Sequence, residues 1–422
     1  MTSHNGNVKV SPRGSASFPY GAAALTKKLA DLRKGKGEAD GDLAVDKYHE
    51  EMKYNFMTAF HELAVPSDMI EKAKADGGFP VYLSGGGFRG WGYLLLYMGQ
   101  IKDRHYPISI INGFSASKSK FSDTARLKKV ARQAENIFRV SDRRRTQVPA
   151  VAYLVNALLE SLPYGISIAH FAQGGVREGI LFRELSLDVR EDDPLEVATK
   201  KYAVQSADRL AKLILNALPK PSDKQNGRTI PAIIDKHLIH AFANIMYVHQ
   251  PMSKELASTA ALYCTSTGFM SSAHGVSHED RALLALLLEE RFEGELPPRE
   301  AEFKVSLQDI LTPELVWWTR YLGAVGLLLA RIFPAGVIDP DDLRINISSE
   351  WASGFGKKNN KEGLRITLSI KKIKHDPMML KDALEEHSKD IKKAGKKKHW
   401  IGGKDGWGMS VDVDIKEVKE LK

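Results

Sequence analysis

The chain is predicted to fold as an α/β layer over residues 1–190, an all-α helical domain over 191–335 and a small α+β unit over 336–422. Three observations predict this organisation. Up to about residue 190, short apolar segments alternate with longer helical segments, as in sheets covered by helices. From there to about residue 335, almost every segment has helical spacing. Beyond Pro334 the apolar residues repeat every second position, which is typical of strands.

In the first domain, apolar runs predict the strands and amphipathic runs predict the helices. Residues 15–32 are expected to turn from a strand into a helix through Pro19 and Gly21, and residues 34–42 are expected to form a flexible polar link. Further strands are expected at 79–83, 107–113 and 166–171, and further helices at 43–64, 93–98, 126–138, 148–162 and after the glycines of 174–185.

The N-terminal residues present an incomplete hairpin signal. Asn5-Gly6 is the strongest short hairpin dipeptide, and an outgoing strand follows it. Only four residues precede the dipeptide, which leaves little chain for an incoming strand. Either Asn5-Gly6 is a plain turn, or the chain lacks a strand that its fold expects.

The rest of the chain is expected to be helical and then to form a small sheet. Helices are predicted at 196–218, 231–249, 254–265, 278–292 and 313–333, with an exposed loop at 219–231. The last helix has an apolar run of about ten residues between Arg320 and Arg331, short of the roughly 20 that cross a membrane, so we expect a buried helix and no membrane contact. A hairpin of 344–351 and 364–372, a polar helix at 376–395 and a strand at 409–415 complete the prediction.

The size, charge and cysteine content favour a folded protein with acidic partners in a reducing compartment. The chain has 422 residues, of which 43% are hydrophobic and 27% charged, and a formal net charge of +9. Positive charge favours nucleotides, polyanions or nucleic acid. Cys264 is the single cysteine, so no intrachain disulfide is expected, and the N-terminus has no apolar segment typical of a secretory signal. A cytoplasmic location is expected.

Two glycine turns are the candidate phosphate-binding elements. VYLSGGGFRGWGYLLL and ISIAHFAQGGVREGILF share the layout strand, glycine turn, helix. Glycine lets backbone N–H groups approach an anion, and a helix N-terminus adds partial positive charge. Both turns could equally be connections that bind nothing. The candidates are Gly85, Gly86, Gly87, Arg89, Gly174, Gly175, Arg177 and Glu178. Glu178 could cap its helix, pair with a basic residue or point into the site.

These turns carry a resemblance to a known family. GGVREGILFREL resembles the Gly-Leu-Arg-Glu-Gly segment of the Ppx/GppA family, which comprises exopolyphosphatases and guanosine pentaphosphate phosphohydrolases. GGGFRGWGYLLL is similar to the adenosine-side glycine turn of that family. SPRGSASFPYGAAAL, PISIINGF, QVPAVAYLVNALLESLP and QGGVREG look like the fungal retrograde regulation protein 2 branch. The similarity is clearest over residues 5–190.

The resemblance implies part of an actin/hexokinase/Hsp70-like ATPase lobe, followed by an HD-like helical domain. The family's Asp-x-Gly-Ser loop, Asp-x-Gly-Gly-Gly-Ser loop and catalytic carboxylate have no counterpart in this sequence. The chain is therefore expected to start within a domain, to contain no catalytic residue and to lack phosphohydrolase activity by itself. The resemblance implies ATP, another nucleotide or polyphosphate as ligand, with Mg²⁺ in the full-length form.

No metal site is expected in the helical domain, although bacterial relatives of the resembled family carry an HD-like domain. The histidines there are His237, His240, His249, His274 and His278. A metal site needs a His-Asp pair and further converging ligands, whereas this chain has Tyr263-Cys264 at the nearest match. Ser277 or His278 instead predicts a helix start. Cys264 is expected to be an inert buried thiol.

The leading functional hypothesis is a regulator of mitochondria-to-nucleus signalling that binds regulatory proteins and a nucleotide. The alternative is an exopolyphosphatase-like phosphohydrolase whose full-length form carries the missing loops. A nucleic-acid-binding module would depend only on charge, such as the basic runs 143–145 and 392–398, and no RNA-binding motif accompanies them. A sheet that lacks its first strands would expose apolar surface, so we also predict self-association.

Overall fold

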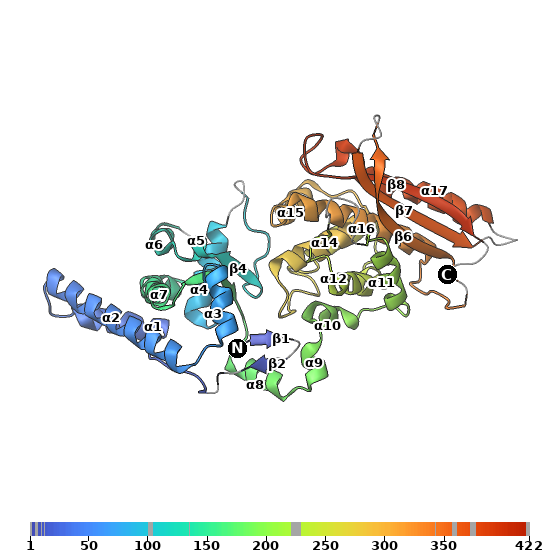
Figure 1. Ribbon diagram of the computed structural model, residues 1–422. Coiled ribbons are helices and arrows are strands. Elements are labelled where there is room, and N and C mark those ends of the chain that lie inside the picture. Colours follow the sequence, from blue (N-terminus) through green and yellow to red (C-terminus); the bar gives the residue numbers. More distant parts are fainter. Residues whose placement is uncertain are drawn as a thin grey trace. The chain divides into compact units, whose positions relative to one another are not determined.

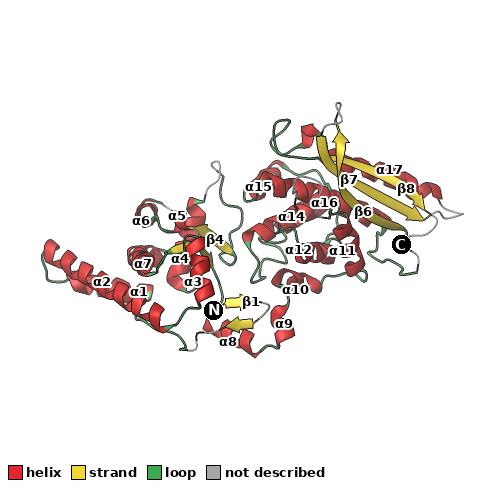
Figure 2. Cartoon of the chain, viewed as in Figure 1, coloured by secondary structure: helices red, strands yellow, loops and turns green. Residues whose placement is uncertain are grey.

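The structure is a computed structural model that describes residues 2–4, 7–9, 11, 13–99, 104–134, 136–220, 229–341, 343–356, 361–371 and 377–418. The chain divides into two compact units, Met1–Asp192 and Asp193–Lys422. Figure 1 labels their helices and strands, and Figure 2 distinguishes the two kinds of element by colour.

The first unit combines a short hairpin, a three-stranded sheet and the helices around it. In chain order its elements are β1 (Thr2–His4), β2 (Asn7–Lys9), α1 (Ala22–Arg33), α2 (Glu38–Glu62), α3 (Ser67–Ala75), β3 (Phe79–Leu83), α4 (Gly86–Met98), β4 (Phe114–Ser117), α5 (Lys118–Phe121), α6 (Thr124–Gln133), α7 (Asp142–Ser161), β5 (Ile166–Phe171), α8 (Val176–Glu184) and α9 (Leu187–Glu191).

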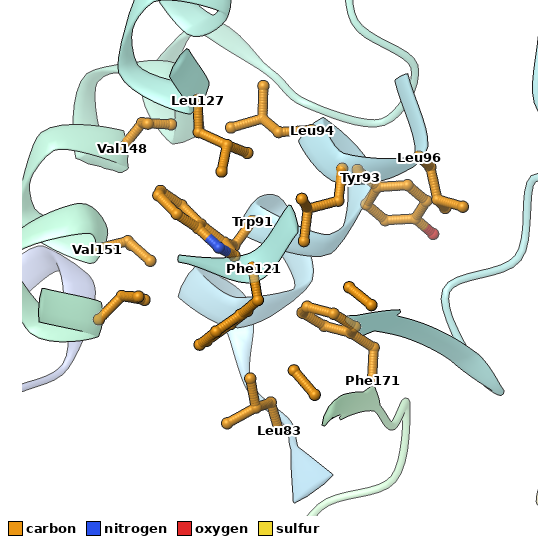
Figure 3. Packing of buried hydrophobic residues seen from close by; sticks show 14 of the residues in the cluster. Leu83, Trp91, Tyr93, Leu94, Leu96, Phe121, Leu127, Val148, Val151 and Phe171 are labelled. Atoms are coloured by element: carbon orange, nitrogen blue, oxygen red, sulfur yellow. The ribbon is translucent and has the colours of Figure 1, made fainter. Parts of the chain in front are cut away.

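The sheet of the first unit has the strand order β3–β5–β4. Strand β5 is parallel to β3 and antiparallel to β4. Alternate residues of a strand point to opposite faces, so Leu83 and Phe171 reach one core together. There they meet Trp91 of α4 and Phe121 of α5, all nearly inaccessible to solvent (Figure 3). Burial of this cluster fixes α4 against the sheet.

A second cluster joins the N-terminal helices to α7. Leu25 of α1, Met52 of α2 and Ala157 of α7 are buried together. The Tyr153 hydroxyl of α7 donates a hydrogen bond of 2.6 Å to the Val45 carbonyl oxygen of α2. Because α7 also packs on α4 and α6, it links this helical layer to the sheet.

A hairpin forms at the N-terminus, where the sequence carries the Asn5-Gly6 signal. Asn5 and Gly6 lie outside the described residues, but β1 pairs antiparallel with β2 on either side of them. The few residues before the dipeptide therefore supply an incoming strand, contrary to the shortage expected from the sequence.

Two predicted strands of the first unit are wrong. Residues 15–19 form no strand; Phe18 instead stacks on Tyr20 at 5.2 Å and meets Phe56 edge-on. Residues 107–113 are also irregular, although Ile108 and Ile111 are buried. These segments bury apolar side chains without forming a regular strand, although the Gly113 N–H donates to the Phe171 carbonyl oxygen at 3.2 Å. The strand that follows, β4, was not predicted.

Several helix boundaries also differ from the prediction. The expected link 34–42 is shorter, because α2 begins at Glu38. The helix expected from residue 148 begins at Asp142, so Pro149 lies inside it. Helix α6 ends at Gln133 rather than at residue 138. The expected strands 79–83 and 166–171 are confirmed.

The second unit holds a helical bundle and a three-stranded sheet. Its elements are α10 (Pro194–Lys200), α11 (Ala207–Asn216), α12 (Lys236–Ile245), α13 (Lys254–Tyr263), α14 (His278–Phe292), α15 (Pro298–Gln308), α16 (Pro313–Ile332), β6 (Ile345–Phe355), β7 (Lys361–Lys371), α17 (Pro377–Ala394), the 3₁₀ turn Lys397–His399 and β8 (Ser410–Val418). Helices α14 and α16 pack closely and are buried along most of their length.

Helix α16 is, among the described residues, the one helix long and apolar enough to cross a membrane by length and composition alone. It is packed inside the unit, with 83% of the apolar window buried. The Trp317 indole N–H donates to the Ala394 carbonyl oxygen of α17 at 3.0 Å, and the Tyr321 hydroxyl donates to the Ala217 carbonyl oxygen at 2.8 Å. These contacts agree with the buried helix predicted for this segment.

The sheet of the second unit follows the predicted pattern. Strands β6 and β7 form the antiparallel hairpin, and β8 returns parallel to β7 after α17. Residues 357–360, in the turn, and 221–228, in the expected loop, lie outside the described residues. Helix α11 packs on β6 and α16 packs on α17, so the helical and α+β segments share one unit.

Two helical predictions need correction here. The expected helix 196–218 is divided into α10 and α11, with Asp193 capping the first through the Leu195 and Glu196 N–H groups. Helix α15 was not predicted, because Pro297-Pro298 suggests a loop; Pro298 instead occupies the first helical position, which needs no N–H donor.

Candidate phosphate-binding site

The pairing of β3 with β5 brings the two glycine turns to one edge of the sheet. Leu83 and Phe171, the last residues of these parallel strands, are register partners. The Ala172 N–H donates to the Leu83 carbonyl oxygen at 2.9 Å and extends the ladder by one residue. Helices α4 and α8 begin shortly afterwards, so both N-termini follow the same edge. Ligands of open α/β sheets bind at this kind of edge.

The first turn exposes backbone at Gly85 and Gly86. Gly85 caps α4 with φ +95°, a conformation that L side chains rarely adopt. A Cβ atom at either residue would meet no atom within 4 Å, so the space in front of this backbone is open. The first N–H groups of a helix have no acceptor inside it. The backbone of Gly85 and Gly86 is therefore accessible from the surface.

Gly87 has a different role from its neighbours. A Cβ atom there would lie 3.0 Å from the Ala22 Cβ atom of α1 and 3.3 Å from a Val151 methyl group of α7. The absence of a side chain at Gly87 lets α4 approach these two helices. This glycine serves packing.

Arg89 lies in the second half of the first turn of α4. Its side chain is partly buried, and its Nε atom is buried without a hydrogen-bond partner among the described residues. A positive charge near a helix N-terminus is unfavourable unless an anion accompanies it. The first turn of α4 contains no acidic residue. Arg89 and the free N–H groups thus make this end of α4 attractive to an anion.

The second turn has a different electrostatic character because of Glu178. Its carboxylate accepts a hydrogen bond of 2.7 Å from the Gly175 N–H. Capping, one of the three roles considered for Glu178, is thus observed. A carboxylate at this N-terminus competes with an external anion. Gly174 adjoins this cap, and Arg177 is exposed on α8, so the α4 turn is the stronger anion site of the two.

A polar row on the sheet was missed by the sequence prediction. Tyr82, His170 and Ser115 are register neighbours on β3, β5 and β4. The His170 ring stacks on Tyr82 at 4.7 Å, and its Nδ1 atom lies 2.7 Å from the Ser115 Oγ atom. Burial lowers the pKa of His170, which favours the neutral ring at pH 7. The sequence signal that could have found this row is strand alternation, because Tyr82 and His170 each directly precede a core residue, Leu83 or Phe171.

Helices α8 and α9 have no buried residue among those described. Val176 and Leu181 of α8 are 80% and 68% exposed. The other large exposed apolar side chains of this segment are Ile180, Phe182, Leu185, Leu187 and Val189. We call this segment, residues 176–191, the apolar strip. An exposed apolar surface of this extent is typical of an interaction site.

Two histidines of the second unit, His237 and His240, lie beside carboxylates. His237 Nδ1 lies 3.0 Å from a Glu196 carboxylate oxygen, and His240 lies within 3.8 Å of Glu196 and Asp208. Within the described ranges, no three His, Cys, Asp or Glu residues form a group that could hold a metal ion. His278 is the first residue of α14 and Ser277 caps it, as predicted.

The cysteine and the basic runs also have identifiable environments. Cys264 is fully buried, as expected, and burial raises its pKa to about 12, so the thiol stays protonated. In the run 143–145, Arg144 donates to the Arg139 carbonyl oxygen and Arg145 to the Ala131 carbonyl oxygen near the end of α6. In the run 392–398, Lys397 lies 5.4 Å from the centre of the Trp400 ring.

Comparisons with known proteins place the chain in a family. The model of the RTG2 C-terminal domain matches residues 193–418, which is most of the second unit. Retrograde regulation protein 2 of Saccharomyces cerevisiae is 33% identical over 363 residues, covering 82% of this chain. The chain spans 58% of the length of that yeast protein. On these matches, the chain belongs to the RTG2 family, to which retrograde regulation protein 2 gives its name.

Proposed function

We propose that the chain is a cytoplasmic regulator of mitochondria-to-nucleus signalling that binds a phosphate-bearing ligand and protein partners. The name of the yeast relative supports the signalling role. The observation that carries the binding role is the N-terminus of α4, which follows the end of β3 with open space before Gly85 and Gly86 and with the partly buried Arg89 nearby. A helix N-terminus attracts a phosphate group through its free N–H groups and its partial positive charge.

The proposed ligand is ATP, another nucleotide or polyphosphate, held on a Ppx/GppA-type scaffold with the actin/hexokinase/Hsp70-like arrangement. The HD-like origin of the helical domain belongs to the same proposal. In the first unit, the backbone of Gly85 and Gly86 and the side chain of Arg89 would bind phosphate oxygens. Arg177 would add long-range attraction from α8. Mg²⁺ would accompany a nucleotide in a full-length form of the protein.

Binding without turnover is the favoured activity. Residues 84–89 and 172–179 contain one acidic residue, Glu178, and its carboxylate caps α8. A phosphohydrolase needs a group that orients or deprotonates the attacking water. Neither glycine turn offers a carboxylate for that task. The alternative, an exopolyphosphatase-like phosphohydrolase, would require residues from the larger length that the yeast relative spans.

Calorimetric titration with Mg²⁺-ATP and with polyphosphate tests the ligand proposal. Arg89→Gln is expected to weaken binding about tenfold or more, because it removes a charge-assisted hydrogen bond of about 1.5–3 kcal/mol. Arg183→Gln, an equal charge change on exposed α8, is the matched control and should leave the affinity unchanged. If neither ligand binds the wild-type chain, the proposed ligand class is wrong.

A phosphate-release assay separates the two functional classes. We expect no release from polyphosphate, guanosine pentaphosphate or ATP beyond that of a heat-denatured sample. Turnover by the native chain would instead support the phosphohydrolase.

The apolar strip is the proposed docking surface for regulatory protein partners. Its apolar side chains are large and exposed, and they recur through α8, α9 and the residues that join them. Substituting Leu181 by Glu places a charge in the middle of the strip and should abolish partner capture without altering ligand affinity. Retention of the partner by this variant would place the interface elsewhere.

A further inference from the structure

A cavity of about 310 Å³ lies in the second unit, and its lining residues come from α13, α14, α16 and the segments next to them. Three of these residues, Lys254, Arg291 and Arg331, are cationic, and none is acidic. The remaining lining is mostly apolar and includes Met252, Phe292 and Leu327. The volume lies in the range of small-molecule sites.

Arg291 is the central feature of this cavity. Its side chain comes from α14, and the residue is 5% exposed. Its Nη2 atom donates to the Gln250 amide oxygen, and its guanidinium lies 4.1 Å from the centre of the Phe292 ring. Its Nε atom is buried without a hydrogen-bond partner in the part of the chain that the structure describes. None of the ion pairs among the described residues includes Arg291, and the charge of Arg331 in the same cavity has the same sign.

A buried arginine without a carboxylate is unusual, since buried charges are normally paired. The pKa of Arg291 is lowered to about 10, mainly by burial; the Tyr247 side chain opposes this shift, and the positive Arg331 adds to it. The guanidinium is still charged at pH 7. An anion in the cavity would supply the missing partner.

The neighbouring Arg281 shows how this fold satisfies an arginine that has a purely structural role. Arg281 is fully buried on the same helix. Its Nη1 atom donates to the Thr265 and Met270 carbonyl oxygens at 2.6 and 3.1 Å, and its Nη2 atom donates to the Ala273 carbonyl oxygen at 2.5 Å. Backbone carbonyl oxygens thus accept from both terminal nitrogens of Arg281, although its Nε atom, like that of Arg291, is buried without a partner among the described residues. Arg291 instead donates to one side-chain amide oxygen, that of Gln250, and lines a cavity.

Two further cations could act with Arg291. Arg331 lies in the last turn of α16, is exposed, and has no partner among the described residues. Lys254 begins α13 and pairs at 3.7 Å with Glu293. Arg331 therefore faces no competing carboxylate, whereas Lys254 is already partly neutralised.

We propose that this cavity binds a small organic anion, a phosphate monoester or a carboxylate with an apolar body, through Arg291 and Arg331. The planar guanidinium of Arg291 would bind two oxygens of the anion. Met252, Phe292 and Leu327 would contact the apolar part. The site lies wholly in the second unit and does not depend on the glycine turns.

Binding is tested on the full chain with inorganic phosphate, glycerol 3-phosphate and succinate at constant ionic strength. At least one probe is expected to raise the thermal midpoint in a saturable way and to give a calorimetric isotherm. The phosphate and succinate arms distinguish the two anion classes. Failure of all three probes, or an unsaturable rise of the kind that an adventitious ion gives, would refute the site.

Arg331→Gln is the first variant, and Arg299→Gln is its matched control on the exposed surface of α15. Arg331→Gln should weaken the binding of whichever probe binds the wild-type chain about tenfold, whereas Arg299→Gln should leave that affinity unchanged. Equal affinities of the two variants would refute the proposal.

Arg291→Met separates ligand binding from a structural role. Replacing an unpaired buried charge by an apolar side chain of similar length is often neutral or stabilising. We expect this variant to keep its thermal midpoint in chloride buffer and to lose the anion-dependent rise. A large loss of stability in every buffer, with anion binding by Arg331→Gln unchanged, would show that Arg291 only supports the fold.

Discussion

Gly85 and Gly87 are two residues apart in one turn and have different physical roles. Gly85 allows a positive φ and leaves open space before the backbone, whereas Gly87 lets α4 touch α1 and α7. Arg281 and Arg291 differ in the same way: Arg281 donates to backbone carbonyl oxygens, whereas Arg291 lines the proposed anion cavity. Glu178 caps a helix, which is a different role from that of a catalytic base. Residue type alone does not distinguish these roles; the surrounding atoms do.

Substituting Gly85 by Ala should destabilise the first unit by about 1 kcal/mol, because a Cβ atom is strained at φ +95°. It should also weaken phosphate-ligand binding. Gly90→Ala is the matched control: it lies inside α4 with free space for a Cβ atom, and should stabilise by about 0.5–1 kcal/mol. Urea unfolding followed by circular dichroism measures both. A neutral Gly85→Ala variant would contradict the strain argument.

His249 should make the stability of the second unit depend on pH. The residue is 7% exposed and lies between the Phe269 and Phe292 rings, and burial lowers its pKa below the ordinary 6.5. The unfolded chain therefore takes up this proton first as the pH falls. Its contribution to stability is complete above about pH 6.5 and is lost as the pH falls toward the folded pKa.

The free energies of unfolding at about pH 7.5 and pH 5.5 test this dependence. His249→Gln should show a smaller loss between the two pH values than the wild-type chain. Substitution of His274, which is exposed, provides the control for removing one histidine. Equal losses in the wild type and His249→Gln would exclude His249 as the source.

The close approach of α14 and α16 depends on glycine spacing in the segment YLGAVG. A Cβ atom at Gly323 would lie 2.5 Å from the Glu290 Cβ atom, and one at Gly326 would lie 2.6 Å from the Phe242 Cζ atom. Arg291 also passes Gly326, with its Cγ atom 3.5 Å from the same position. This packing therefore holds the proposed anion cavity in shape.

Gly326→Ala should destabilise the second unit by about 1–3 kcal/mol through overpacking against Phe242. Phe242→Leu removes the clashing ring atom, so the double variant should recover part of that loss. Urea unfolding of the four members of the cycle gives the coupling energy. Strictly additive effects would show that the clash is relieved by another movement.

The chain as a whole contains two units with different surfaces. The second unit buries its long apolar helix α16, whereas the first leaves the apolar strip on α8 and α9 exposed. Such a strip should promote association of copies of this chain in dilute solution. Self-association was expected from the sequence on the ground of an unpaired sheet edge; the exposed helices provide a more specific reason.

Light scattering over a concentration series tests the self-association. The wild-type chain is expected to form larger species as its concentration rises, and the double variant Val176→Glu/Leu181→Glu should remain smaller. Lys→Glu substitution at the exposed Lys212 on α11 is a control for added negative charge. A monodisperse wild-type monomer would contradict this prediction.

Local patterns in the chain were sufficient for most elements. The strands 79–83 and 166–171, the β6–β7 hairpin and the long helices follow from hydrophobic periodicity, which depends on neighbours in sequence. The same patterns failed at 15–19 and 107–113, since an apolar segment can be buried without forming a regular strand. The glycine turns were recognised, but their meeting at one sheet edge was not.

Spatial partners were the part that required the folded chain. The register of Leu83 with Phe171 and the contact of Arg291 with Gln250 both join residues that are distant in sequence. The order of the residues by itself determines side-chain chemistry and local spacing. Burial, charge pairing and free space arise only when distant segments pack, because each depends on which atoms the fold brings within a few ångströms.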